Sequence, residues 1–216
     1  MTGIEISVKR ARRAIVVGWV AFGVSLLMCL LSTLAFWFYT MLPDLLEMLA
    51  EEEGMPGMIT MEMLDPSVIG AFFSCIWSFA EVAAIAIGVA IIFWWLWFSK
   101  FVDNRKSKRM GGFAASLSSL IPGFGVFIHY FIVKDALAVL ESEFEERGTE
   151  NKSGIARAYG AFALWFWAVV AAMGFLTFST FGYWLMILFV EFVCFTAFFR
   201  YIKLMSALKS EEEKLV

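Results

Sequence analysis

Long apolar runs alternate with charged segments along the chain, and this pattern predicts the architecture. The apolar runs cover about residues 14–42, 68–98, 158–178 and 182–203. A helix crosses the hydrocarbon core of a bilayer with about 20 residues. We therefore predict an all-α integral membrane protein with four transmembrane helices.

A fifth apolar segment, residues 111–133, is interrupted near its middle by Pro122, Gly123 and Gly125. These residues disfavour a continuous helix, and each remaining piece is too short to cross a bilayer alone. The segment is predicted to form a broken helical hairpin, either re-entrant or interfacial.

Residues 134–147 are predicted to form a cytoplasmic amphipathic helix. Its apolar face is built from residues three or four positions apart, namely Val133, Leu137, Leu140 and Phe144. Such a face lies on a membrane or packs on a partner, and Gly148 is a plausible helix stop.

The basic residues predict the orientation. All 17 Lys and Arg residues fall in residues 1–13, 99–157 and 200–216. If the hairpin returns to the side on which it enters, these segments share one side, and Lys and Arg accumulate in cytoplasmic loops. The loop 43–67 carries seven carboxylates and no basic residue. We predict a multi-pass plasma-membrane protein with both termini cytoplasmic.

Two elements are predicted at the borders of this outside loop. The acidic segment after Pro43 resembles a short amphipathic helix that ends at Gly54. At the far border, Asp65 is a potential N-cap, with Pro66 at the first position of the second span.

The composition excludes several classes of protein. Hydrophobic residues make up 61% and charged residues 17% of the chain, too apolar for a soluble domain of 216 residues. One His and three Cys within apolar runs provide no disulfide framework, zinc site or hydrolase triad. The basic residues show no nucleic-acid footprint. We expect no enzyme activity and no cofactor.

Two carboxylates lie near the centres of predicted spans, Glu81 in the second and Glu191 in the fourth. One hypothesis is a coupled pair that binds a proton or cation. The alternative is that each is a neutral acid that donates a hydrogen bond to Ser78, a backbone carbonyl or a partner subunit.

Small and polar residues recur along one face of each of the first two spans. Such faces allow close helix approach and interhelical hydrogen bonds, so the two spans are predicted to pack along them. The residues are Gly18, Ser25, Cys29 and Ser32 in the first span, and Ser74, Ser78, Glu81, Ala84 and Gly88 in the second.

The outside loop is rich in methionine. Thioethers are soft ligands for Cu(I), and the spacing resembles the methionine motifs of copper transporters. The alternative is an adaptable apolar contact surface. The residues are Met55, Met58, Met61 and Met63.

Several aromatic and polar residues are assigned to the inner interface. Trp94, Trp97 and Tyr201 are predicted to belong to an aromatic belt. His129 is interpreted as a hydrogen-bonded interfacial residue. Arg105 is assigned to a basic loop that orients the chain.

Together these features favour a non-enzymatic subunit or scaffold of a larger membrane complex, because the soluble segments are too small for a catalytic domain. Its expected partners are the lipid bilayer and other proteins or further copies of the chain. Two alternatives remain open. The first is a small proton- or cation-coupled transporter or channel that uses Glu81 and Glu191, and the second is a Cu(I)-handling membrane protein.

Overall fold

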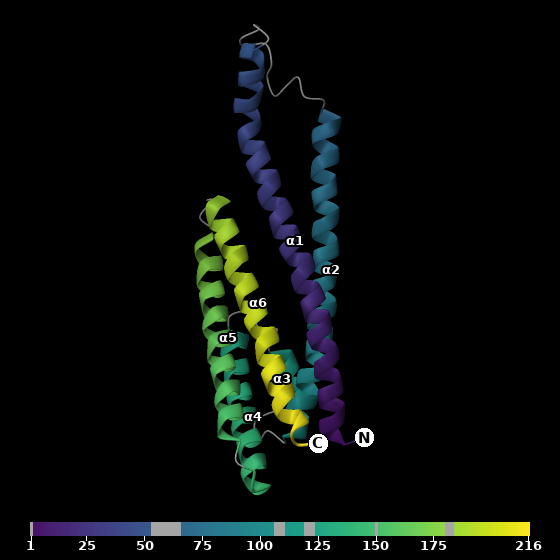
Figure 1. The fold of residues 1–216 in the computed structure, drawn as a ribbon, viewed down its shortest axis with the longest axis vertical. Coiled ribbons are helices and arrows are strands. Elements are labelled where there is room, and N and C mark those ends of the chain that lie inside the picture. The colour runs from purple at the N-terminus through teal and green to yellow at the C-terminus, as the bar shows by residue number, and fades with distance from the viewer. Residues whose placement is uncertain (1, 53–65, 106–110, 119–123, 150, 180–183) are drawn as a thin grey trace. The chain divides into compact units, whose positions relative to one another are not determined.

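The chain folds into helices joined by short connections. The computed structural model describes residues 2–52, 66–105, 111–118, 124–149, 151–179 and 184–216, and within these ranges there is no strand. The helices of the described part are α1 (Gly3–Glu52), α2 (Pro66–Asn104), α3 (Gly112–Ser118), α4 (Phe124–Glu146), α5 (Lys152–Ser179) and α6 (Trp184–Glu213) (Figure 1).

Three helical segments are long and apolar enough to cross a membrane. They are Gly3–Leu42 in α1, Glu81–Asn104 in α2 and Lys152–Gly174 in α5. The predicted all-helical class is confirmed for the described residues, which include three candidate membrane-spanning helices.

The described chain divides into two compact units. Unit 1 comprises Met1–Phe22 and Ile87–Val216, and unit 2 comprises Gly23–Ala86. Unit 1 therefore contains the start of α1, the end of α2 and all of α3 to α6. Unit 2 contains the remainder of α1 and α2, and each unit is described below by itself.

Some helices join elements that the sequence pattern separates. Helix α1 continues through Pro43 to Glu52, so the first predicted span and the predicted loop helix form one element. Helix α2 begins at Pro66, as expected for proline at the first helical position. Helix α4 unites the second arm of the predicted hairpin with the predicted amphipathic helix.

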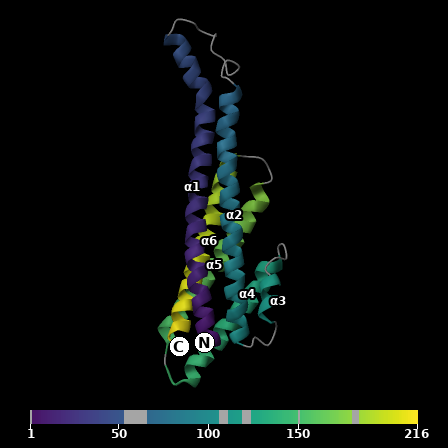
Figure 2. The same ribbon diagram turned by 90° about the vertical axis from the view of Figure 1, so that its right-hand side faces the viewer.

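The hydrophobic core of unit 1 is formed by side chains from all of its helices. Helices α5 and α6 pack along each other in antiparallel directions (Figures 1 and 2). The start of α5 lies beside the end of α6, where Asn151, just before α5, donates a hydrogen bond to Glu211. The largest buried apolar side chains are Trp97, Phe98, Phe101, Leu137, Leu140, Ile202, Leu204, Met205 and Leu208.

The predicted apolar face of α4 is buried. Its four residues, Val133, Leu137, Leu140 and Phe144, are at most 3% exposed and belong to the core of unit 1. The periodicity was correct, but the face packs on the chain's own helices rather than on a membrane or a partner. Gly148 follows this helix with φ 65°, which confirms the predicted stop.

Helix α3 starts in close contact with the end of α2. The backbone N–H of Gly112 donates a hydrogen bond to Asp103 Oδ1 at 2.7 Å. A Cβ added at Gly112 would overlap the carbonyl oxygen of Ser99, whereas one added at Gly111 would meet no heavy atom within 4 Å.

We expect Gly112→Ala to lower the free energy of unfolding by about 1–3 kcal/mol, because a backbone carbonyl cannot move away cheaply. Thermal unfolding in detergent micelles measures the effect. Gly111→Ala is the matched control and should change stability by less than about 0.5 kcal/mol. Equal effects at both positions would contradict the proposed steric cause.

Both chain ends lie at the same end of unit 1 (Figures 1 and 2). The side chain of Asn104, at the end of α2, donates a hydrogen bond to the carbonyl oxygen of Gly3 at 2.8 Å. Arg10 donates to the carbonyl oxygen of Leu96 at the same distance. The start of α1 is therefore held against the end of α2.

Candidate functional site

Two features of unit 1 combine burial with polar chemistry, and the first is a cluster around Arg105. Its guanidinium lies 2.8 Å from the Glu212 carboxylate, and both side chains are at most 1% exposed. Ser7 donates a hydrogen bond to the other carboxylate oxygen of Glu212, also at 2.8 Å. Glu143 approaches the guanidinium at 3.8 Å. These residues, the Arg105 cluster, connect α1, α4 and α6 to the end of α2.

The Arg105 side chain also packs on its own helix. Its guanidinium carbon lies 4.0 Å from the centre of the Phe101 ring, and it donates to the Phe101 carbonyl oxygen at 3.1 Å. This aromatic contact stabilises the cation in a place that water does not reach.

Neighbouring residues extend the polar contacts at this end of unit 1. Lys214 donates to Glu211 at 2.6 Å and to the Asn151 side-chain oxygen at 3.1 Å. Arg147 donates to the carbonyl oxygen of Leu215 at 2.6 Å. The residues that follow α4 are therefore tied to the end of α6.

Burial raises the pKa of the Glu212 carboxyl, and the opposing effects of Arg105 and Ser7 do not cancel it. The assignment of Arg105 to a basic loop that orients the chain stays a prediction, and the structure shows in addition that its side chain is buried and paired with Glu212. The cluster is a buried charge pair that joins helices, and we interpret it as structural.

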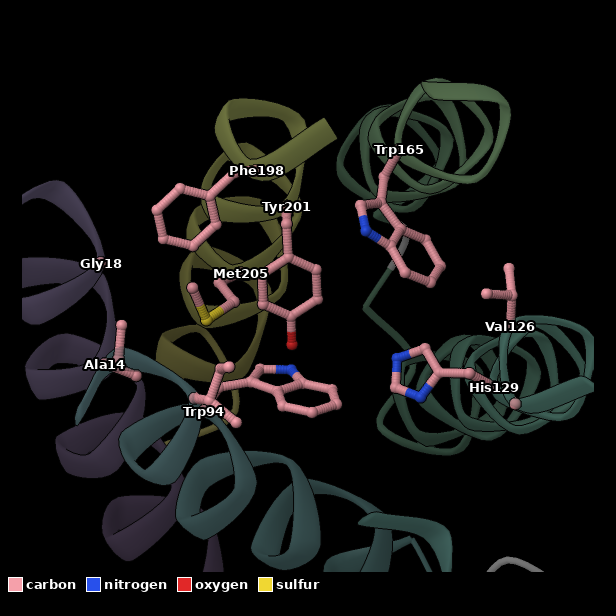
Figure 3. Close-up of a pocket in the computed structure, with 12 residues that line it drawn as sticks. Ala14, Gly18, Trp94, Val126, His129, Trp165, Phe198, Tyr201 and Met205 are labelled. Carbon is pink, nitrogen blue, oxygen red and sulfur yellow. The ribbon is translucent and has the colours of Figure 1, made fainter. Parts of the chain in front are cut away.

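The second feature is a cavity of about 220 Å³, termed the aromatic cavity (Figure 3). Helices α1, α2, α4, α5 and α6 all contribute to it. The lining residues are Ala14, Gly18, Ala90, Ile91, Trp94, Gly125, Val126, His129, Trp165, Phe198, Tyr201 and Met205.

The imidazole of His129 is surrounded by aromatic rings. Its centre lies 4.5 Å from the Phe98 ring, 5.3 Å from Trp94 and 5.2 Å from Trp165. The Tyr201 ring meets the Trp94 ring edge to face at 5.4 Å. The view into the cavity shows His129 across from Tyr201 and Trp94 (Figure 3).

These surroundings keep His129 neutral. The side chain is buried on α4, outside the three candidate spans, and burial lowers its pKa to about 3. Neither ring nitrogen has a hydrogen-bond partner among the described residues. The interpretation of His129 as a hydrogen-bonded interfacial residue was therefore wrong.

The prediction of an aromatic belt also differs from the structure at the inner end of α2 and in α6. Trp97 is fully buried, and Trp94 and Tyr201 pack against the hydrophobic core. These rings pack on one another instead of lining the outer surface, because five helices converge around them.

The small and polar face of α2 lies at the surface of the chain. Ser74, Ser78, Glu81 and Ala84 are exposed, and Gly88 is half-buried. The hydroxyl of Ser78 donates to the carbonyl oxygen of Ser74 at 3.0 Å. We call the four exposed residues the α2 polar face.

The corresponding face of α1 is more buried. Ser25 is buried, while Cys29 and Ser32 are half-buried in unit 2. Gly18 belongs to unit 1, where an added Cβ would come 3.3 Å from a side-chain carbon of Ile202. At Gly18, α1 thus approaches α6 closely, whereas the sequence predicted an approach to the second span.

Other predicted residues lie partly or wholly beyond the described structure. Glu191 lies on α6 and its side chain is outside the described part, so its pairing with Glu81 stays a prediction. Pro122 and Gly123 are outside the described residues, whereas Gly125 lines the aromatic cavity. The four methionines of the predicted copper motif also fall outside: Met55, Met58, Met61 and Met63.

Sequence reasoning missed the aromatic cavity and the Arg105–Glu212 pair. Arg105 and Glu212 are 107 positions apart, so no local spacing connects them. A signal for the cavity existed in the solitary His129 within an apolar, aromatic segment, but its aromatic neighbours come from other helices.

Comparison of the chain with protein-family models, curated proteins and solved structures gave no match. The class of the protein follows from its own fold: an all-helical protein with three helices long and apolar enough to cross a membrane.

Proposed function

We propose that this protein is a non-enzymatic subunit or scaffold of a larger complex in the plasma membrane. The observation that carries the proposal is the exposure of the α2 polar face. A membrane-spanning helix with small and hydroxylated residues on its outer face is suited to contact a neighbouring helix closely.

The position of Glu81 strengthens this proposal. It is the one charged residue of the apolar run 68–98, and it is exposed on the chain while Ala83, on the other side of the helix, is buried. Glu81 is the first residue of the candidate span in α2, and a carboxylate that faces lipid inside a membrane carries a free-energy cost. A partner helix over this face would replace lipid with protein around Glu81.

The arrangement of unit 1 supports the proposed topology of four spans with a re-entrant hairpin. Contacts at one end of the unit join the start of α1, the end of α2, the start of α5 and the end of α6. Gly112 at the start of α3 and Glu143 near the end of α4 lie by the same end of α2. If this end faces the cytoplasm, the basic segments obey the positive-inside rule.

Photocrosslinking from α2 tests the proposal. A photoreactive phenylalanine analogue at Ser78 is expected to form a protein adduct in intact membranes, because the α2 polar face meets a partner helix. Mass spectrometry of the adduct distinguishes a second copy of the chain from a different subunit.

Phe79 provides the matched control. It is also exposed and lies at almost the same depth, but it points about 160° away from Glu81 around the helix. The analogue at Phe79 should give little protein adduct. Lipid adducts alone at Ser78, or equal protein adducts at both positions, would overturn the proposal.

A further inference from the structure

Four polar atoms in or beside the aromatic cavity are buried without a hydrogen-bond partner among the described residues. They are Trp94 Nε1, the Tyr201 hydroxyl oxygen and both ring nitrogens of His129. Buried polar groups in folded proteins are nearly always paired. A ligand that enters the cavity would supply hydrogen-bond partners near these side chains, which line it.

Water alone fits this cavity poorly. A volume of about 220 Å³ corresponds to about seven water molecules, and each buried water makes two to four hydrogen bonds to polar groups. The four polar atoms belong to three side chains, while the other lining residues present mainly carbon atoms. The larger part of the space is suited to an apolar group.

The lining also selects against a charged ligand. None of the twelve lining residues is Asp, Glu, Lys or Arg, and His129 is neutral because of its burial. An ion transferred to such surroundings would lose its hydration without gaining a counter-charge.

Hydrogen-bond donors outnumber acceptors in the cavity. The Trp94 indole N–H can only donate, the Tyr201 hydroxyl donates, and one nitrogen of neutral His129 carries a proton. A ligand that accepts hydrogen bonds, as a carbonyl oxygen does, would pair with these three donors, whereas the unprotonated nitrogen of His129 is itself an acceptor. Aromatic rings around the space favour a flat, conjugated group.

The helices that line the cavity suggest a lipid-soluble ligand. Gly18, Trp94 and Trp165 line it, and each belongs to a different candidate membrane-spanning segment. A lipid-soluble molecule could reach a site built from these segments.

We propose that the aromatic cavity binds the flat, uncharged, carbonyl-bearing head of a lipid-soluble molecule, the chemistry that a quinone represents. The three contacting side chains are Trp94, His129 and Tyr201. This proposal is independent of the α2 polar face, which lies on unit 2.

Calorimetric titration of the purified protein in detergent micelles tests the binding. The probe is tetramethyl-1,4-benzoquinone, whose ring positions are fully substituted, and the control is 1,2,4,5-tetramethylbenzene, which lacks the carbonyl oxygens. The quinone should bind about tenfold or more tightly than the hydrocarbon, as expected for one or two hydrogen bonds. Equal affinity, or no binding of the quinone, would overturn the proposal.

Variants assign the binding to this cavity. Trp94→Phe and Tyr201→Phe each remove one donor while keeping an aromatic ring, and each should weaken quinone binding by about three- to tenfold. Trp97→Phe is the matched control, since Trp97 Nε1 is also buried without a partner among the described residues but Trp97 does not line the cavity. Its quinone affinity should be unchanged.

Tyr201→Phe also separates binding from a structural function of the hydroxyl. Because this hydroxyl has no partner within the described chain, its removal should leave the thermal stability of the ligand-free protein unchanged or raised. If Trp94→Phe does not fold, Tyr201→Phe carries the test by itself. An unchanged quinone affinity in Tyr201→Phe, or a loss as large in Trp97→Phe, would refute the assigned site.

Discussion

Replacing Arg105 with methionine is expected to lower the free energy of unfolding by about 3–5 kcal/mol, because Glu212 would lose its charge partner in a site that water does not reach. The two groups lie 2.8 Å apart, and both side chains are at most 1% exposed. Unfolding of the purified protein in detergent, followed by circular dichroism, measures the loss.

A double variant separates the cost of an unpaired charge from the value of the pair itself. In Arg105→Met with Glu212→Leu, neither charge remains, so most of the stability lost in the single variant should return. A double variant as unstable as the sum of the two single changes would argue against this origin.

An exposed ion pair between α1 and the end of α6, next to Glu212, provides the control. Arg12 lies 3.3 Å from Glu213, and the two side chains are 71% and 36% exposed. Solvent screens this pair, so Arg12→Met should cost less than about 1 kcal/mol. A loss at Arg105 no larger than that at Arg12 would show that burial does not govern the Arg105 cluster.

Acidification below pH 6.5 is expected to destabilise the protein through His129. Its pKa is about 3 in the folded chain, against the ordinary value of 6.5. The unfolded chain therefore binds a proton in this range while the folded chain does not. The contribution of neutral, buried His129 to the free energy of unfolding is fully present above pH 6.5. It falls by about 1.4 kcal/mol per pH unit as the pH decreases toward 3.

The variant His129→Phe should remove this dependence. His129 is the only histidine of the chain, so the difference between wild type and variant reports this residue alone. The measurement is the midpoint of thermal unfolding in detergent between pH 4 and pH 7.5. Identical pH profiles for the two proteins would mean that His129 is hydrated or paired in the folded state.

Glu212 acts in the opposite direction. Its pKa in the folded chain is raised above the ordinary value of 4.5 by burial, so between these two values the folded chain binds the proton more tightly. Stability from Glu212 therefore decreases as the pH rises through this window. Because His129 and Glu212 change the stability in opposite directions with pH, the wild-type profile alone does not separate them. The difference between wild type and His129→Phe gives the His129 contribution, and the profile of the variant retains that of Glu212.

Local patterns in the sequence predicted the helices and the apolar face of α4, but not that this face packs inside the chain's own core. Val133 and Leu137 are buried as their spacing indicates, and Pro66 and Gly148 mark helix ends. These features depend on residues within a turn or two of each other. Hydrophobic periodicity and terminal residues are therefore sufficient to find them.

The sites depend on contacts between distant residues, and the sequence did not predict them. Trp97 and Tyr201 are residue types typical of a membrane-interface belt, and they lie near predicted span ends. In the structure, however, they pack inside unit 1. Tryptophan and tyrosine are found both at membrane interfaces and in protein cores, so the residue type alone does not decide between the two locations. Arg105 likewise has the sequence context of a basic loop, and that context does not predict its buried pairing with Glu212 of α6.

The Arg105 cluster also has a consequence for biosynthesis. Ser7 is made 205 residues before the Glu212 to which it donates a hydrogen bond. Until α6 has been synthesised, Arg105 lacks its principal counter-charge and the start of α1 lacks this anchor. The Arg105 cluster can therefore form only after α6 has been synthesised, and the start of α1 must stay available until then.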